Sequence, residues 1–99
     1  MALTTDKKIS GTFSGIGSSN HFLVEGWVRI QADVGSGTTV VIKESLDESL
    51  WIASKMPDGT TDNAFTADFS LPLFFPVQTY VKLECTVYGA STPYDMRRG

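Results

Sequence analysis

The sequence contains one cysteine and one histidine in 99 residues. Cys85 has no partner for an intramolecular disulfide, and its place on the apolar side of an alternating segment predicts a small buried hydrophobe. Transition-metal centres use several His or Cys ligands, so we expect no metal site and no cofactor. His21 follows a Gly-rich turn, and we interpret it as an exposed strand residue rather than a general base.

Long apolar runs are also missing. Nothing in the chain approaches the ~20 apolar residues of a membrane-spanning helix. The N-terminal segment MALTTDKKIS lacks the apolar stretch of a secretory signal. We therefore expect a protein that is made in a reducing, aqueous compartment and has no membrane partner.

Positive charge is scarce, because 8 Lys and Arg stand against 11 Asp and Glu and the formal net charge is −3. Affinity for phosphate backbones comes mainly from clustered Lys and Arg, so we expect no nucleic-acid partner. The one tight basic pair is Arg97-Arg98. It is interpreted either as a solvated tail or as a contact for an acidic patch on a partner.

The chain has the length of one domain. Residues 1–8 are polar without a period and predict a flexible N-terminal arm, and residues 9–99 form the predicted β-domain. The clearest alternation lies in residues 22–34, where Phe22, Val28 and Ile30 share the apolar face. Gly26 interrupts that face and predicts a bend, a bulge or a close approach of another backbone. Trp27 falls on the otherwise polar face.

The stretch TTVVIKESLDESLW, residues 38–51, predicts a hairpin that organises the fold. Val40 and Ile42 share one strand face, and the returning strand carries Trp51, which we expect to seat the hairpin in the core. The acidic residues of its turn lack the ligand spacing of a calcium loop, and turn solvation explains them better. The predicted core comprises Phe22, Val28, Ile30, Val40, Ile42, Trp51, Phe69, Leu83 and Cys85.

Short strands separated by Gly/Pro turns, with no convincing helix between them, predict an all-β fold. We favour a single-domain antiparallel β-sandwich, jelly-roll or Ig-like, of about 7–8 strands, over a partly closed barrel. A Pro57-Asp58-Gly59 turn separates the central hairpin from the next strand. Pro72 and Pro76 predict that residues 63–73 are an edge strand, which runs into an irregular connection before a further strand at residues 78–88.

No arrangement of residues in the sequence predicts catalysis or a small-molecule substrate, so we expect a binding protein rather than an enzyme. Leu73-Phe74-Phe75 is conspicuously apolar and serves either as an interface or in the core. The predicted interface set is Trp27, Leu73, Phe74, Phe75, Tyr94, Arg97 and Arg98.

Several motifs together resemble a family of small virion proteins of tailed bacteriophages. They are GTFSGIGSS near the start, a long strand with a mid-strand Gly, VVIKESLD with a Trp four residues on, a Pro-Asp-Gly turn, and YVKLECTVY before a short closing strand. The likeness spans about Gly11 to Met96. Glu48-Ser49 replaces the family's usual glycine pair. This difference affects the expected geometry of the hairpin turn but not the expected strand pairing.

The resemblance implies a non-enzymatic virion component made in the host cytoplasm, and most plausibly a capsid decoration or cement protein. Its partners would be the major capsid protein and copies of itself, expected as a trimer on the capsid surface. A tail, head-completion or fibre-attachment component is the alternative within the virion. A carbohydrate-binding module with Trp27 or Trp51 as a stacking platform is the alternative from another class.

Overall fold

The structure, a computed structural model, describes residues 3–55 and 61–99 and has eight strands and no helix within them. The predicted Pro57-Asp58-Gly59 turn lies outside the described residues. No helix in the described part of the chain has the length and apolar character needed to cross a membrane. The strands are β1 (Lys8–Phe13), β2 (Gly17–Ser18), β3 (Phe22–Ala32), β4 (Thr39–Ser45), β5 (Ile52–Ala53), β6 (Ala64–Phe65), β7 (Phe69–Val87) and β8 (Thr92–Arg98).

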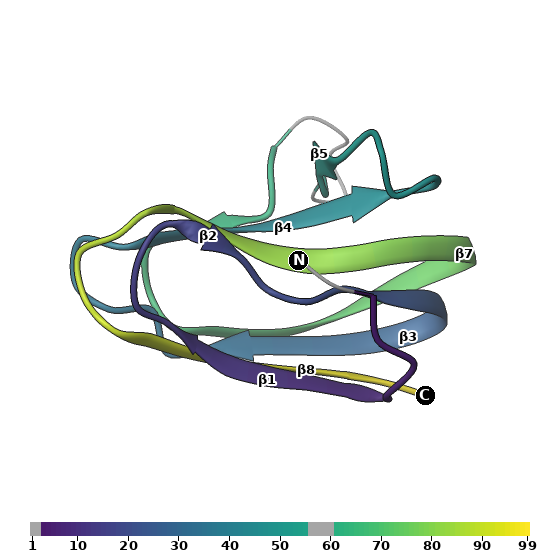
Figure 1. Cartoon of the computed structure of the whole chain (residues 1–99), viewed down its shortest axis with the longest axis horizontal. Helices are drawn as coiled ribbons and strands as arrows, with labels where there is room; N and C mark the ends of the chain where they lie inside the picture. Colours follow the sequence, from purple (N-terminus) through teal and green to yellow (C-terminus); the bar gives the residue numbers. More distant parts are fainter. Residues whose placement is uncertain (1–2, 56–60) are drawn as a thin grey trace.

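The eight strands form one open antiparallel sheet that folds over on itself (Figure 1). The order is β1-β8-β3-β7-β4-β5, with β2 beside β7 and β6 beside β4. β7 is 19 residues long; its residues 69–75 and 79–81 pair with β3, and its residues 80–87 pair with β4. It therefore passes from the β1–β8–β3 layer into the layer that contains β4. The predicted all-β, sandwich-like fold is confirmed, with the difference that both layers belong to a single sheet.

The bend between the layers has a local cause in β3. The register between β3 and β7 shifts between Val24 and Gly26. Gly26 has a φ of +99°, in the left-handed region that residues with a Cβ rarely adopt. An added Cβ would meet nothing within 4 Å, so the backbone conformation rather than lack of space requires the glycine. Of the bend, bulge or close backbone approach predicted from Gly26, the structure shows a bulge-like shift in register.

The prediction of two strands joined by an irregular connection is wrong, because residues 69–87 are continuous in β7. Residues 69–75 pair with β3 alone, as an edge strand does. Pro72 and Pro76 are four residues apart and so share a side of the strand. A proline is tolerated in an edge strand when its nitrogen faces the unpaired side, since no ladder bond is then lost. The prolines thus mark the open edge of β7 rather than a break.

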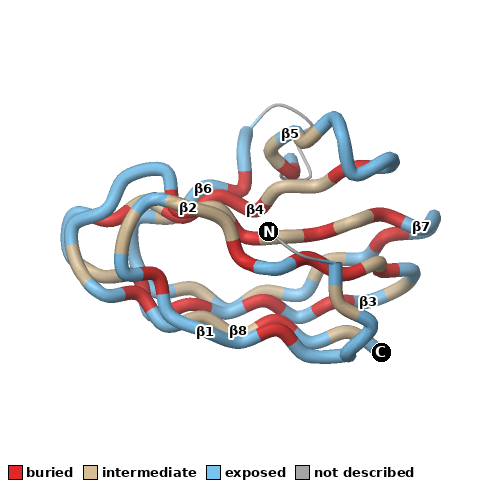
Figure 2. Tube along the Cα trace, viewed as in Figure 1, coloured by how far each residue is buried: buried red, intermediate tan, exposed pale blue. Residues whose placement is uncertain are grey.

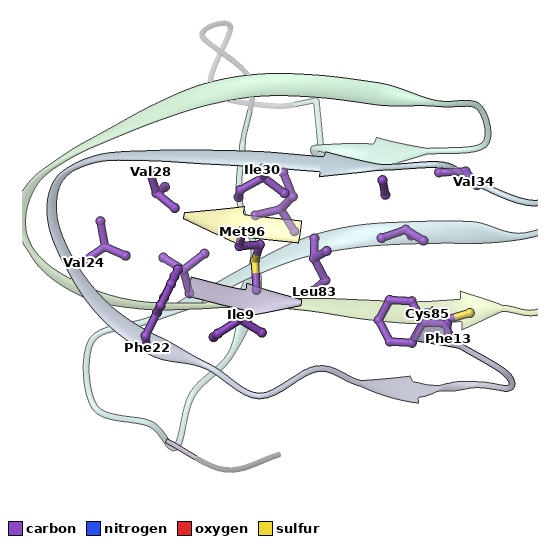
Figure 3. Close-up of a cluster of buried hydrophobic side chains, with 14 of the residues drawn as sticks. Ile9, Phe13, Phe22, Val24, Val28, Ile30, Val34, Leu83, Cys85 and Met96 are labelled. Carbon is purple, nitrogen blue, oxygen red and sulfur yellow. The ribbon is translucent and has the colours of Figure 1, made fainter. Parts of the chain in front are cut away.

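The core lies between the two layers, and the buried positions alternate along the strands (Figures 2 and 3). Seven residues of the predicted core are buried, namely Phe22, Val28, Ile30, Val40, Ile42, Leu83 and Cys85. Phe69 is half-buried and packs against this cluster. Trp51 is half-buried and is not part of the cluster, so its predicted role as a core anchor is wrong.

The connection between β3 and β4 is fixed to the connection between β7 and β8. The buried Thr38 hydroxyl accepts hydrogen bonds from the backbone N–H groups of Gly89 (2.9 Å) and Ala90 (3.0 Å). A Cβ on Gly89 would lie 2.3 Å from the carbonyl oxygen of Ser36. The two turns approach each other closely because residue 89 has no side chain.

Candidate interaction surfaces

The connection from β4 to β5 is an exposed but internally ordered loop. Its residues 46–50 are all exposed, and the side chains of Leu46 and Leu50 are 72% and 70% exposed. Asp47 Oδ1 accepts hydrogen bonds from the backbone N–H groups of Ser49 and Leu50, both at 2.9 Å. These N–H groups hold the pKa of Asp47 below its usual value, so its carboxylate stays charged. The loop presents two leucines beside a fixed negative charge.

A buried histidine ties this loop to the body of the protein. His21 Nε2 lies 2.8 Å from Glu48 Oε2, and His21 is only 7% exposed. The interpretation of His21 as an exposed residue is therefore wrong, because the loop folds over it. Glu48 has a φ of +65°, the one positive φ found at a non-glycine residue of the described chain. The contact between Glu48 and His21 holds Glu48 in this strained backbone conformation.

Trp51 and Tyr80 complete the support of the loop. Trp51 Nε1 donates to the Glu48 carbonyl oxygen at 3.2 Å, and its ring meets the His21 ring edge-on at 5.2 Å. Lys82 Nζ lies 4.2 Å from the centre of the Trp51 ring. The negative charge of Glu48 raises the pKa of Tyr80. Trp51 thus fixes the loop rather than filling the core.

An apolar groove of about 390 Å³ runs between the loop and the bend of β7. Leu46, Leu50 and Ile52 line one side of it, and Pro76 and Val77 line the other. The acidic residues Glu44 and Asp47 also border this groove. The sequence alone does not indicate this groove, because its two sides come together through the bend of β7.

A second apolar feature lies on the outer face of the other layer. Trp27 of β3 is directly opposite Phe74 of β7, and their ring centres are 5.2 Å apart. Trp27 is 62% exposed and Phe74 is 55% exposed. Leu73 is half-buried against the core, and Phe75 is buried within it. The predicted interface role of Phe75 is therefore wrong for a surface contact, because its side chain points inward.

Cationic side chains lie beside this aromatic pair. Lys8 of β1 is opposite Arg97 of β8, and Arg97 is opposite Arg29 of β3, so the three share a face across neighbouring strands. Arg97 makes two hydrogen bonds with the Asp95 carboxylate, at 3.0 and 3.1 Å, which hold the pKa of Asp95 below its usual value. No ion pair of the described residues includes Arg29. Like charges directly opposite each other destabilise a sheet unless an anionic group compensates them.

The remaining predicted interface residues have contacts within the chain. The Arg98 guanidinium donates to the carbonyl oxygens of Thr5 (2.7 Å), Asp6 (3.1 Å) and Leu23, and so holds the N-terminal segment against β3. Thr4 N–H also donates to the His21 carbonyl oxygen at 2.9 Å. Tyr94 is half-buried, its ring packs 4.7 Å from Phe13, and burial raises its pKa.

An open hollow of about 450 Å³ lies where the end of β3 meets the starts of β7 and β8. Asp33 and Asp68 share a hydrogen bond there, and the bond and the repulsion between them raise the pKa of Asp33. Within residues 3–55 and 61–99, no three His, Cys, Asp or Glu side chains are grouped so that they could hold a metal ion.

Comparison of the chain with protein-family models, with curated proteins and with solved structures finds no match.

Proposed function

We propose that this chain is a structural protein of a bacteriophage virion, a capsid decoration protein that binds the outer shell and stabilises it between neighbouring major capsid proteins. The observation that carries the proposal is the pair of exposed apolar surfaces on an otherwise well-packed domain. One is the leucine-bearing loop of residues 46–50, and the other is the Trp27–Phe74 pair.

The loop surface supports an attachment role because it is ordered before any partner arrives. Asp47 and Glu48 fix the backbone through hydrogen bonds to Leu50 N–H and His21, while Leu46 and Leu50 remain in solvent. An ordered surface loses little conformational entropy on binding, so more of its apolar contact area contributes to affinity. Leu46 and Leu50 are not isolated apolar residues, because they line one groove with Ile52, Pro76 and Val77, and contiguous apolar patches mark interaction sites.

The placement on a phage capsid comes from the resemblance to small virion β-proteins described above. A shell-binding protein of this class needs a rigid body and a surface repeated by symmetry. The bent antiparallel sheet, with its core between the layers, supplies the rigid body.

The copy number of the chain in purified particles tests the proposal. A decoration protein is present in hundreds of copies per particle, so quantitative mass spectrometry with labelled standard peptides should give that number. About a dozen copies or fewer would overturn the capsid placement in favour of a tail, head-completion or fibre-attachment component. Absence from washed particles would overturn the virion function altogether.

Carbohydrate binding is a second candidate function, and the position of Trp27 favours it. The indole is exposed on the outer face of β3, on the same side of the strand as Arg29 and Gln31, which also line a groove of about 260 Å³. Aromatic rings beside hydrogen-bonding side chains suit the alternating apolar and polar faces of sugars. Titration of Trp51→Phe, which keeps Trp27 as the sole tryptophan, with a panel of oligosaccharides should then change its fluorescence. No change with any glycan would exclude this function.

A further inference from the structure

We propose that the 46–50 loop of one copy, together with the end of β4 from Glu44, docks on the Trp27–Phe74 face of a second copy of this chain. The inference rests on the association between copies that the resemblance to virion proteins implies for the proposed function, and it assigns the loop and the Trp27–Phe74 face to that contact. The segment that binds the face is thus the loop described above. The first argument for this contact is the opposite charge of the two surfaces.

The loop carries one sign of charge. Residues 44–50 have the sequence ESLDESL, with three carboxylates and no Lys or Arg. Asp47 is held ionised by the backbone N–H groups that it accepts from Ser49 and Leu50. Those bonds use Oδ1, so Oδ2 can still accept a hydrogen bond from a partner. The loop therefore offers two leucines next to a carboxylate that remains charged.

The face carries the opposite charge around an apolar centre. Trp27 and Phe74 form that centre, and Arg29 follows Trp27 on the same face of β3. Arg97 lies opposite Arg29, but its partner Asp95 already compensates it. Arg29 has no ion pair within the described residues and lies opposite a like charge. A carboxylate from the loop of a second copy would satisfy it, because guanidinium groups pair well with carboxylates.

The residue types of the two surfaces also fit a protein contact. Tryptophan, tyrosine and arginine are enriched among the residues that dominate binding energy, and the residues around them act mainly by excluding water from the contact. Leu46 and Leu50 are the most exposed aliphatic side chains of the loop, and Trp27 is the most exposed aromatic side chain of the face. The contact would bury these apolar side chains, which are exposed to solvent in the isolated chain.

The two surfaces belong to different layers of the fold, which determines the symmetry of the assembly. The loop extends from β4, and the face is the outer side of the layer that contains β1, β8 and β3 (Figure 1). A copy whose loop is docked still presents its own face to another copy. Such head-to-tail contacts give closed rings when the rotation closes and open chains when it does not. A two-fold dimer would need the loop and the face of each copy to reach the same neighbour at once, and their positions in different layers oppose this.

Two variants each remove one half of the contact. Leu50→Ser alters the loop, and Trp27→Ser alters the face, and both side chains are exposed enough for the monomer to stay folded. Ile16→Ser is the matched control, because Ile16 is 73% exposed but lies in the β1–β2 turn. Circular dichroism and urea unfolding of each variant should match those of the wild-type protein before association is compared.

Sedimentation velocity over a range of concentrations then measures association of the full chain. The wild-type protein and Ile16→Ser should form species of three or more copies. Leu50→Ser and Trp27→Ser should each weaken association at least about tenfold. An equimolar mixture of the two variants should form heterodimers, because the intact loop of one meets the intact face of the other.

Three results would overturn the inference: a monomeric wild-type protein, variants that associate as the wild-type protein does, or a mixture that stays monomeric while both variants are folded. These results are separate from the copy number in particles. If the chain associates through this contact but is absent from particles, the inference holds and the proposed function is wrong. If the chain is present in hundreds of copies per particle but does not associate through this contact, the proposed function holds and the inference is wrong.

Discussion

Replacement of Glu48 should produce an inverted order of stability, with the glycine variant more stable than the alanine variant. In ordinary loop positions alanine is favoured, because glycine has more conformational freedom to lose on folding. Glu48 has a φ of +65°, where a Cβ is crowded by the backbone. Glycine has no Cβ and adopts this conformation without strain.

The magnitude follows from three contributions. Both variants lose the 2.8 Å contact with His21 and leave its buried Nε2 without that partner, which costs about 1–3 kcal/mol. The lower end applies, because the Glu48 side chain is 38% exposed and solvent screens the pair. Glycine recovers roughly 1–2 kcal/mol of left-handed strain but costs ~0.4–1 kcal/mol in the unfolded state. Glu48→Gly should therefore be about 0.5–1 kcal/mol more stable than Glu48→Ala.

Urea unfolding followed by tryptophan fluorescence measures this difference, at one fixed protein concentration because association shifts apparent stability. With a denaturant slope of ~1–3 kcal/mol per M, the midpoints of the two variants should differ by roughly 0.2–1 M. Ser49→Gly and Ser49→Ala are the matched controls at the next loop residue, and here alanine should be the more stable. If Glu48→Ala proves more stable than Glu48→Gly, Glu48 does not have the strained left-handed conformation on which the prediction rests.

Three further outcomes are expected. Leu83→Ala should lower the free energy of unfolding by about 2–5 kcal/mol, because Leu83 is fully buried, and a loss below ~1 kcal/mol in urea unfolding would contradict its place in the core. Gly89→Ala should lower the thermal midpoint, since its Cβ would lie 2.3 Å from a carbonyl oxygen, whereas Gly15→Ala has open space and should not. Asp68→Asn should stabilise the protein at pH 7 more than at pH 4, because the raised pKa of Asp33 means that deprotonation beside Asp68 costs stability as pH rises; an equal effect at both pH values would refute the pairing.

Most of the core could be predicted because burial in a strand follows a period of two. Phe22, Val28 and Ile30 share parity in β3, and all three are buried. The period survives the bulge at Gly26, so Trp27 lies on the outer face, as its parity indicates. A pattern that depends on one strand alone can be recognised from sequence alone.

The predictions that failed depend on contacts between distant segments. His21 is buried by a loop that lies 27 residues further along the chain, and neither segment signals the other. Trp51 packs against His21 and Lys82 on the outside of the sheet, although its size predicts a core residue. The prolines of β7 indicated a break, because the sequence does not show which side of a strand is left unpaired.

The candidate surfaces could be predicted only in part. Trp27 was recognisable as an apolar residue on a polar face, and Phe74 as part of an apolar run. The row of Lys8, Arg97 and Arg29 is formed by three strands that are far apart in sequence. The groove beside Leu46 likewise needs the bend of β7. Strand order, which alternation does not specify, decides which residues are neighbours on these faces.

The claim at the centre of this account is that the exposed face of β3 and β7 is a contact surface, and one measurement tests it most directly. Acrylamide quenching of the wild-type protein, after subtraction of the signal of Trp27→Phe at the same concentration, reports on Trp27 and leaves the contact of Trp51 with the loop intact. The quenching constant should be high in dilute solution, where the side chain is 62% exposed, and should fall as the concentration rises and copies associate. Quenching that stays high while sedimentation shows association would contradict the claim, because the copies would then meet through some other surface.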